Sequence, residues 1–137
     1  MQSNAPIVIV DDSPQDREFA QHTLRRLPLT VPLVFLTCGA DLKAYVDGLA
    51  AYGNRAIYPY PGVVLLDLEM PNGDGFETLE WLKAQTAHAA LPIIALSGSK
   101  SLAHVNRAYG LGARSFLTKP IDLKDFQSMI KVLKLSI

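Results

Sequence analysis

Five short apolar segments, separated by stretches with helical periodicity, constrain the fold of this chain more than any other feature. The segments are Ile7–Val10, Leu33–Leu36, Val63–Leu66, Ile93–Leu96 and Ser115–Leu117. The first four are apolar throughout rather than alternating, which is typical of strands in a parallel sheet that helices cover on both faces. The fifth is more polar and is supported by its position in the series. We therefore expect five strands, each followed by a helix.

The stretches between these segments repeat apolar residues with the period of an α-helix. The expected core faces are, in chain order, Phe19, Thr23, Leu24 and Leu27; Leu42, Tyr45, Val46 and Leu49; Phe76, Leu79, Leu82 and Lys83; Leu102, Val105 and Tyr109; and Leu123, Phe126, Ile130 and Leu133. Ser13, Pro14 and Asp16 predict an N-cap, a first-turn proline and the acid of a capping box. Asp122 predicts the N-cap of the last helix, and Gly110 the end of the fourth.

Strictly alternating strands and helices predict an open, doubly wound, five-stranded parallel sheet of the flavodoxin-like kind, because crossovers between parallel strands are right-handed. The 137 residues suffice for one domain with a buried core, and no linker divides them. We therefore expect a single α/β domain over residues 1–137. Functional sites in such folds lie outside the carboxyl ends of the strands.

Composition and charge argue against several classes of protein. Thirteen Lys and Arg residues balance thirteen Asp and Glu residues, so no net positive charge favours nucleic acid. No apolar run approaches the roughly 20 residues that span a bilayer, and the N-terminus lacks the features of a signal peptide. A single cysteine, Cys38, rules out an internal disulfide. We expect a soluble, cytoplasmic protein that binds neither nucleic acid nor membranes.

Polar and charged residues follow the predicted strands. Asp11 and Asp12 follow the first strand, and Asp67 follows the third. Ser97 follows the fourth, and Lys119 comes shortly after the fifth. Each taken alone is most simply a turn or a helix cap. Three carboxylates gathered at one edge, however, repel one another unless cations lie among them. Lys119 supplies one positive charge, and Mg²⁺, which prefers oxygen ligands, suits the rest. The alternative is a solvated acidic edge without a metal.

Four segments resemble, in order, the signature blocks of bacterial response-regulator receiver domains, and these are VIVDDSPQDR, VVLLDLEMPNGDGFETL, IIALSGS and ARSFLTKP. The likeness extends from about Ile7 to Leu133. It implies a single-domain phosphoacceptor switch of a two-component system, phosphorylated by a sensor histidine kinase, without an output domain. The signal would leave through the fourth helix, fifth strand and fifth helix to a partner protein. The implied chemistry is self-phosphorylation and self-dephosphorylation, not enzymatic turnover of another substrate.

The resemblance also implies a role for each residue at the edge of the sheet. Asp67 would accept the phosphoryl group. The metal ligands would be Asp11, Asp12 and Asp67, together with the backbone carbonyl of Glu69. Phosphoryl transfer depends mostly on electrostatic stabilisation, which Mg²⁺ and Lys119 would supply.

Three further residues would respond to the phosphoryl group. Lys119 would pair with it, and Ser97 would donate a hydrogen bond to it. Phe116 would be an aromatic switch that turns inward, although an ordinary core phenylalanine explains that residue equally well. An acyl phosphate on Asp67 would be reactive, so hydrolysis would reset the switch.

Two rival functions fit the same kind of sheet less well. A Mg²⁺-dependent aspartyl phosphohydrolase typically has a second Asp two residues after its nucleophile and a cap domain, whereas this chain has Glu69 there and no residues left for a cap. A flavin or nucleotide module needs a phosphate-binding loop after the first strand. The carboxylates of DDSPQD would instead repel a phosphate that lacks a metal.

Several features depart from the family pattern or lie outside it. We expect the side chain of Glu69 to be free to meet incoming water and to set the lifetime of the phosphoryl group. The stretch 47–62 is longer than the family needs, and it is either a partner-specific loop or a plain surface insertion. None of the histidines, His22, His88 and His104, follows a strand, so we expect all three on the surface.

The last helix carries more apolar residues than one buried face can accommodate. Beyond its predicted core face lie Met129, Val132, Leu135 and Ile137. An exposed apolar patch often marks an interaction site, and a two-fold homodimer is the commonest closed arrangement. The alternative is that the last turn frays and these residues fold back on the domain.

Overall fold

The computed structural model describes residues 5–27, 32–99 and 101–135. Its elements are, in order, β1 (Ile7–Val10), α1 (Pro14–Leu24), β2 (Leu33–Leu36), α2 (Gly39–Asp47), the 3-10 helix η1 (Ala50–Gly53), β3 (Val63–Asp67), the 3-10 helix η2 (Pro71–Gly73), α3 (Asp74–Ala84), β4 (Ile93–Ser97), α4 (Leu102–Gly110), β5 (Ser115–Thr118) and α5 (Leu123–Leu133). All five predicted strands are confirmed, and β3, β4 and β5 each extend one residue further than predicted.

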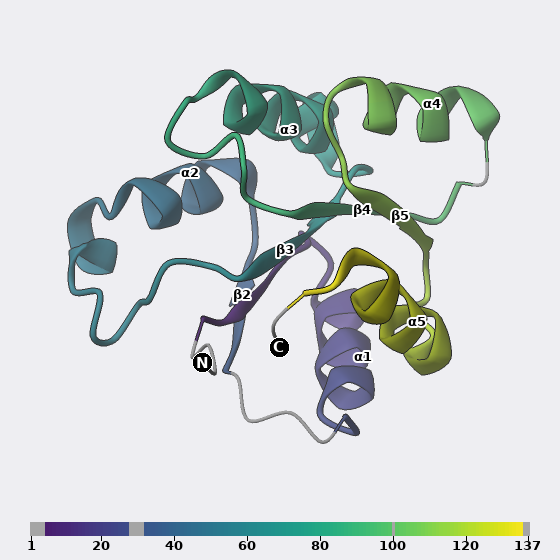
Figure 1. Cartoon of the computed structure of the whole chain (residues 1–137), viewed down its shortest axis with the longest axis horizontal. Coiled ribbons are helices and arrows are strands. Elements are labelled where there is room, and N and C mark those ends of the chain that lie inside the picture. Colours follow the sequence, from purple (N-terminus) through teal and green to yellow (C-terminus); the bar gives the residue numbers. More distant parts are fainter. Residues whose placement is uncertain (1–4, 28–31, 100, 136–137) are drawn as a thin grey trace.

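The five strands form one parallel sheet in the order β2-β1-β3-β4-β5. In its register, Ile7 of β1 lies between Leu33 of β2 and Val63 of β3. Helices α1 and α5 cover one face, and α2, α3 and α4 cover the other (Figure 1). The chain therefore reverses its winding at β1 and β3, whose carboxyl ends form the topological switch point where such folds bind ligands. The flavodoxin-like α/β fold is confirmed.

Two apolar cores lie on the two faces of the sheet. Residues of β1, β3 and β4 contribute alternately to both cores, which explains why these strands are apolar throughout. The predicted face of α3 is largely correct, since Phe76, Leu79 and Leu82 are buried and Lys83 is half-buried.

Three of the other predicted helix faces need correction. In α1, Phe19 is 48% exposed and Ala20 is buried in its place. Leu49 lies beyond the end of α2 and is exposed. In α4, Leu102 and Tyr109 are exposed, and Ala108 is the buried residue. The physical reason in α4 is that a helix of nine residues meets the sheet along a narrow strip, which a small side chain fills.

The buried face of α5 is rotated from its predicted position. Phe126 and Met129 are buried, whereas the other predicted core residues, Leu123, Ile130 and Leu133, are half-buried. Met129 is therefore a core residue and not a surplus one. Val132 is 76% exposed, Leu135 is half-buried, and Ile137 lies outside the described residues.

Local capping groups explain where α1 and α5 begin. The Ser13 hydroxyl accepts a hydrogen bond from the Asp16 backbone amide, and the Asp122 carboxylate accepts one from the Asp125 amide. The N-terminus of α2 is capped from another element, because the Gly39 amide donates to the Asp74 carboxylate at 2.7 Å. A side chain at Gly39 would collide with Asp74 and Thr78. This contact holds the start of α2 against the start of α3.

None of the helices in the described residues is long and apolar enough to cross a membrane.

Candidate functional site

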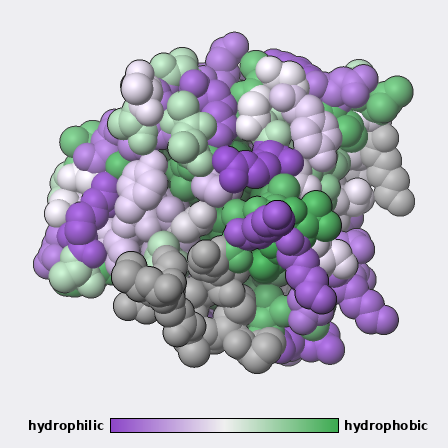
Figure 2. Space-filling model, viewed as in Figure 1, coloured by the Kyte–Doolittle hydropathy of each residue, from purple (hydrophilic) through white to green (hydrophobic). Residues whose placement is uncertain are grey.

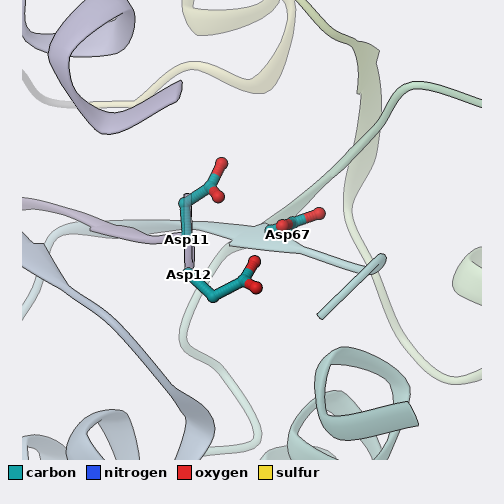
Figure 3. Close-up of side chains that lie close together, drawn as sticks. All are labelled: Asp11, Asp12 and Asp67. Atoms are coloured by element: carbon teal, nitrogen blue, oxygen red, sulfur yellow. The ribbon is translucent and has the colours of Figure 1, made fainter. Parts of the chain in front are cut away.

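Three carboxylates gather where β1 and β3 end at the switch point. Asp11 and Asp12 directly follow β1, and Asp67 is the last residue of β3 (Figure 3). One oxygen from each lies within 4.8 Å of the others. Asp11 and Asp67 are buried, and Asp12 is exposed. This donor set of hard oxygen ligands with one open side fits a small divalent cation that keeps part of its water shell.

Lys119, which directly follows β5, lies in the same site. Its Nζ atom lies 2.9 Å from Asp11 Oδ2 and 3.1 Å from Asp67 Oδ2. It also lies 2.9 Å from Asp16 Oδ2 in the first turn of α1. The predicted capping box is therefore only half formed, because the Asp16 carboxylate turns to Lys119.

The environment of the site raises the pKa values of both Asp67 and Lys119. Burial raises the pKa of Asp67 to about 6, since the opposing hydrogen bond from the Glu69 amide and the charge of Lys119 compensate only in part, and Asp11 adds repulsion. Burial alone would lower the pKa of Lys119, but its hydrogen bonds with Asp11 and Asp16 raise that pKa above its ordinary value. Lys119 therefore stays protonated near neutral pH, and a further cation beside Asp67 would favour its ionised form.

The end of β4 supplies a hydroxyl and a constrained loop. Ser97 is buried, and its Oγ accepts a hydrogen bond from the Ser99 amide at 3.0 Å. The next amide, that of Gly98, donates to the side-chain carboxylate of Glu69. The expectation that the Glu69 side chain is free was therefore wrong, because it links the loop after β3 to the loop after β4. Its backbone amide donates to Asp67 Oδ1 at 2.9 Å.

Phe116 lies on β5 and is half-buried against the core between the sheet and α2, α3 and α4. This position leaves both earlier interpretations open, so its role as a switch stays a prediction.

A cavity of about 490 Å³ connects this site with the surface beside α1. Its polar side includes Asp11, Asp16, Glu69 and Lys119. Its apolar wall consists of Ile9, Phe19, Ala20, Leu96, Pro120 and Ile121. The site therefore has an open approach lined on one side by charge and on the other by apolar side chains.

A second polar cluster, which the sequence did not predict, lies near the beginnings of β3 and β4. His88 is buried, contrary to the expectation that all histidines are on the surface. Its Nε2 atom lies 2.7 Å from Asp47 Oδ1, and its Nδ1 atom lies 2.7 Å from the Tyr60 hydroxyl. His22 is exposed, as expected, and His104 is half-buried.

The insertion at 47–62 is tied to α2 by Arg55. The Arg55 guanidinium donates to the Tyr45 carbonyl at 2.8 Å and to the Val46 carbonyl at 2.9 Å, so it caps the C-terminal end of α2. In addition, the Tyr45 hydroxyl donates to the Pro59 carbonyl at 2.8 Å. The insertion is thus an ordered part of the fold with its own network of contacts.

Comparison with protein families and with known proteins gives a consistent result. The family described as response regulator receiver domain matches residues 7–131. Response regulator Rcp1 of Synechocystis sp. is 31% identical over 132 residues, which cover 95% of this chain and 88% of that protein.

Solved structures agree with these matches. The bacteriophytochrome response regulator AtBRR superposes with a TM-score of 0.83 at 32% identity, covering 96% of this chain and 93% of that one. The Mn²⁺-bound form of Rcp1 superposes with a TM-score of 0.76 at 29% identity, covering 95% of this chain and 91% of that one.

Proposed function

The chain belongs to the response regulator receiver domain family, and on that premise we propose that Asp67 accepts a phosphoryl group with Mg²⁺ bound beside it. Proteins of this family are phosphoacceptor switches that take their phosphoryl groups from histidine kinases. The observation that carries the assignment to Asp67 is its burial at the end of β3, in contact with Lys119 and beside Asp11. We infer no turnover of any substrate other than the protein's own phosphoryl group.

The proposed metal ligands are the carboxylates of Asp11, Asp12 and Asp67 and the backbone carbonyl of Glu69. Bound Mg²⁺ would neutralise charge on the phosphoryl oxygens during transfer. Rcp1 has been solved in a Mn²⁺-bound form, which supports binding of a divalent cation by this chain as well. The acidic cluster, with its exposed Asp12, offers carboxylate ligands for such an ion.

The chain's own residues then perform the transfer. An Asp67 carboxylate oxygen attacks phosphorus, the bond from phosphorus to the donor's histidine nitrogen breaks, and that nitrogen keeps the bonding electron pair. The Lys119 ammonium pairs with the transferred group, and the Ser97 hydroxyl donates to one of its oxygens. Transfer replaces the single negative charge of the Asp67 carboxylate with the roughly −1.5 to −2 charges of the phosphoryl group, so the negative charge beside Lys119 grows by about one. Hydrolysis of the acyl phosphate resets the protein.

We propose that the signal passes through the face of α4, β5 and α5 to a separate partner protein. Ser97 is the last residue of β4 and Lys119 directly follows β5, so movement of either toward the phosphoryl group shifts this face. Phe116, on β5 between them, is the proposed aromatic switch. The phytochrome response regulators among the similar structures support a phytochrome-type histidine kinase as the donor to screen first.

The direct test is phosphorylation of the purified protein with acetyl phosphate and Mg²⁺, followed by intact-mass measurement. We expect one added phosphoryl group in the wild type, none in Asp67→Asn, and none when Mg²⁺ is removed by a chelator. Asp125→Asn, a matched change at an exposed residue of α5, should behave as the wild type. A phosphoryl adduct in Asp67→Asn, or one that forms without a divalent cation, would contradict the assignment.

We also propose a homodimer through the exposed side of α5. Val132 is 76% exposed there, and Figure 2 shows hydrophobic side chains gathered next to α5 with hydrophilic ones beside them. Removal of such a surface from water favours association. Sedimentation at several concentrations should show a dimer that Val132→Asp dissociates, while Lys131→Asp, at the neighbouring exposed position, has a smaller effect. A monomer at every concentration would exclude this dimer.

A further inference from the structure

Lys119 is shared by more carboxylates than the proposed chemistry requires. In the described part of the chain it pairs with Asp11, Asp16 and Asp67. Two of these belong to the acidic cluster, and Asp16 does not. Asp16 comes from the first turn of α1, and its side chain is 46% exposed at the mouth of the site cavity. The Lys119 side chain is only 16% exposed, so its charge depends on these three partners.

Mg²⁺ and Lys119 would compete for the same two carboxylates. The ammonium lies 2.9 Å from Asp11 and 3.1 Å from Asp67, both of which are proposed metal ligands. A cation that enters must therefore share these carboxylates with the Lys119 ammonium or displace the ammonium from them. Asp16, at 2.9 Å from the same nitrogen, offers Lys119 a carboxylate that the metal does not need.

The ion pair between Asp16 and Lys119 disfavours binding of the phosphoryl group. Once Asp67 carries that group, Lys119 must turn to its oxygens, and the bond with Asp16 competes for the ammonium. The Asp16 carboxylate also adds a negative charge near the incoming anion, and like charges at short range disfavour each other. One side chain thus favours the metal and opposes the phosphoryl group.

We propose that Asp16 is a positioning residue that draws the Lys119 ammonium away from the metal ligands and restrains its move to the phosphoryl group. This inference rests on the proposed function of Asp67. Its distinctive consequence is a pair of effects with opposite signs, which a general loss of structure would not produce.

The test uses Asp16→Asn and two binding measurements. Calorimetric titration gives the affinity for Mg²⁺, and titration of beryllium fluoride at saturating Mg²⁺ gives the affinity for an anion that mimics the phosphoryl group. We expect Mg²⁺ to bind about two- to fivefold more weakly and beryllium fluoride about two- to fivefold more tightly, the range for a partly exposed ion pair. The Ser13 cap uses the backbone amide of Asp16, so α1 keeps its N-cap in the variant.

Two further variants serve as controls. Glu18→Gln removes the same charge from an exposed position of α1 that, in the described part of the chain, forms no ion pair with Lys119, and we expect both affinities to stay near those of the wild type. Asp16→Glu keeps the carboxylate and should restore both affinities toward the wild-type values.

Unchanged affinities in Asp16→Asn, or two shifts in the same direction, would overturn the inference. Failure of the wild type to bind Mg²⁺, or beryllium fluoride binding that survives Asp67→Asn, would instead overturn the proposed function on which it rests.

Discussion

The two edges of the sheet hold polar clusters of contrasting kinds. At the carboxyl edge, Asp11 and Asp67 are buried together and share one ammonium. At the amino edge, the buried His88 has one partner for each ring nitrogen, the Asp47 carboxylate and the Tyr60 hydroxyl. The first cluster has an excess of negative charge that a ligand could neutralise. The second satisfies its own hydrogen bonds.

The two clusters differ in their effect on stability, since the carboxyl-edge cluster lowers it and the amino-edge cluster raises it. Buried like charges destabilise a fold, and a site prepared for a cation accepts that cost. A fully paired buried cluster contributes to stability instead. Changes at the carboxyl edge should therefore affect ligands and pH dependence, and changes at the amino edge should affect stability alone.

The largest expected effect is on stability as a function of pH at the carboxyl edge. The pKa of Asp67 is about 6 in the folded protein, against an ordinary value of 3.8. Between these values the folded state binds more protons than the unfolded state. The contribution of Asp67 to the unfolding free energy is therefore fully present below about pH 4 and is lost as pH rises through 6. The loss should approach about 3 kcal/mol. Urea unfolding without divalent cations measures it.

Asp67→Asn provides the control for this measurement. Its unfolding free energy should lack the contribution from Asp67, so the wild type should lose more stability than the variant between pH 4.5 and 7.5. Equal slopes in the two proteins would contradict the prediction.

The next effect concerns the amino edge. His88→Ala removes both hydrogen bonds and the ring that stacks on Tyr60 at 5.7 Å, so we expect the unfolding free energy to fall by about 2 kcal/mol. Acetyl phosphate should phosphorylate the folded variant at the wild-type rate. His22→Ala, at an exposed position of α1, should change stability by less than about 0.5 kcal/mol. A slower phosphorylation in His88→Ala would show that the two edges are coupled.

The smallest effect concerns the lifetime of the phosphoryl group. Glu69→Ala frees the Gly98 amide and removes a negative charge beside the site, so we expect the dephosphorylation rate to change by about two- to tenfold, the worth of one hydrogen bond. Phosphorylation itself should persist. The decay of radiolabelled protein measures the rate, with Glu80→Ala on the exposed side of α3 as the matched control. An unchanged decay rate in Glu69→Ala would refute this role.

The strands and the gathering of Asp11, Asp12 and Asp67 were predictable from the sequence because each depends on local pattern and topology. Strands buried on both faces are apolar throughout, and parallel strands bring the residues after them to one edge. The prediction for α4 failed because apolar periodicity assumes that exposed positions are polar. Leu102 is 71% exposed in the structure, so its side chain does not serve the core.

The contacts that sequence reasoning missed join segments that lie far apart in the chain. The sequence pattern around Asp16 predicted only a role in capping α1, yet its carboxylate binds Lys119, which is 103 residues away. The two partners of His88 lie 41 and 28 residues away in the chain, and the partner of the Glu69 side chain lies 29 residues away. A spacing pattern within one element contains no signal for such pairs. The one local signal was the acid in the first turn of α1, four residues after Asp12.

The contacts of Trp81 determine what the protein's fluorescence can report. It is the only tryptophan of the chain, and its ring lies 6.0 Å from that of His88 and 5.5 Å from Lys43 Nζ. It lies about 10 Å along α3 from the end of the helix nearest Asp67. Its emission is therefore an optical signal from the amino edge. Spectroscopic detection of phosphorylation will need a fluorophore placed elsewhere, and the natural one is free to follow unfolding.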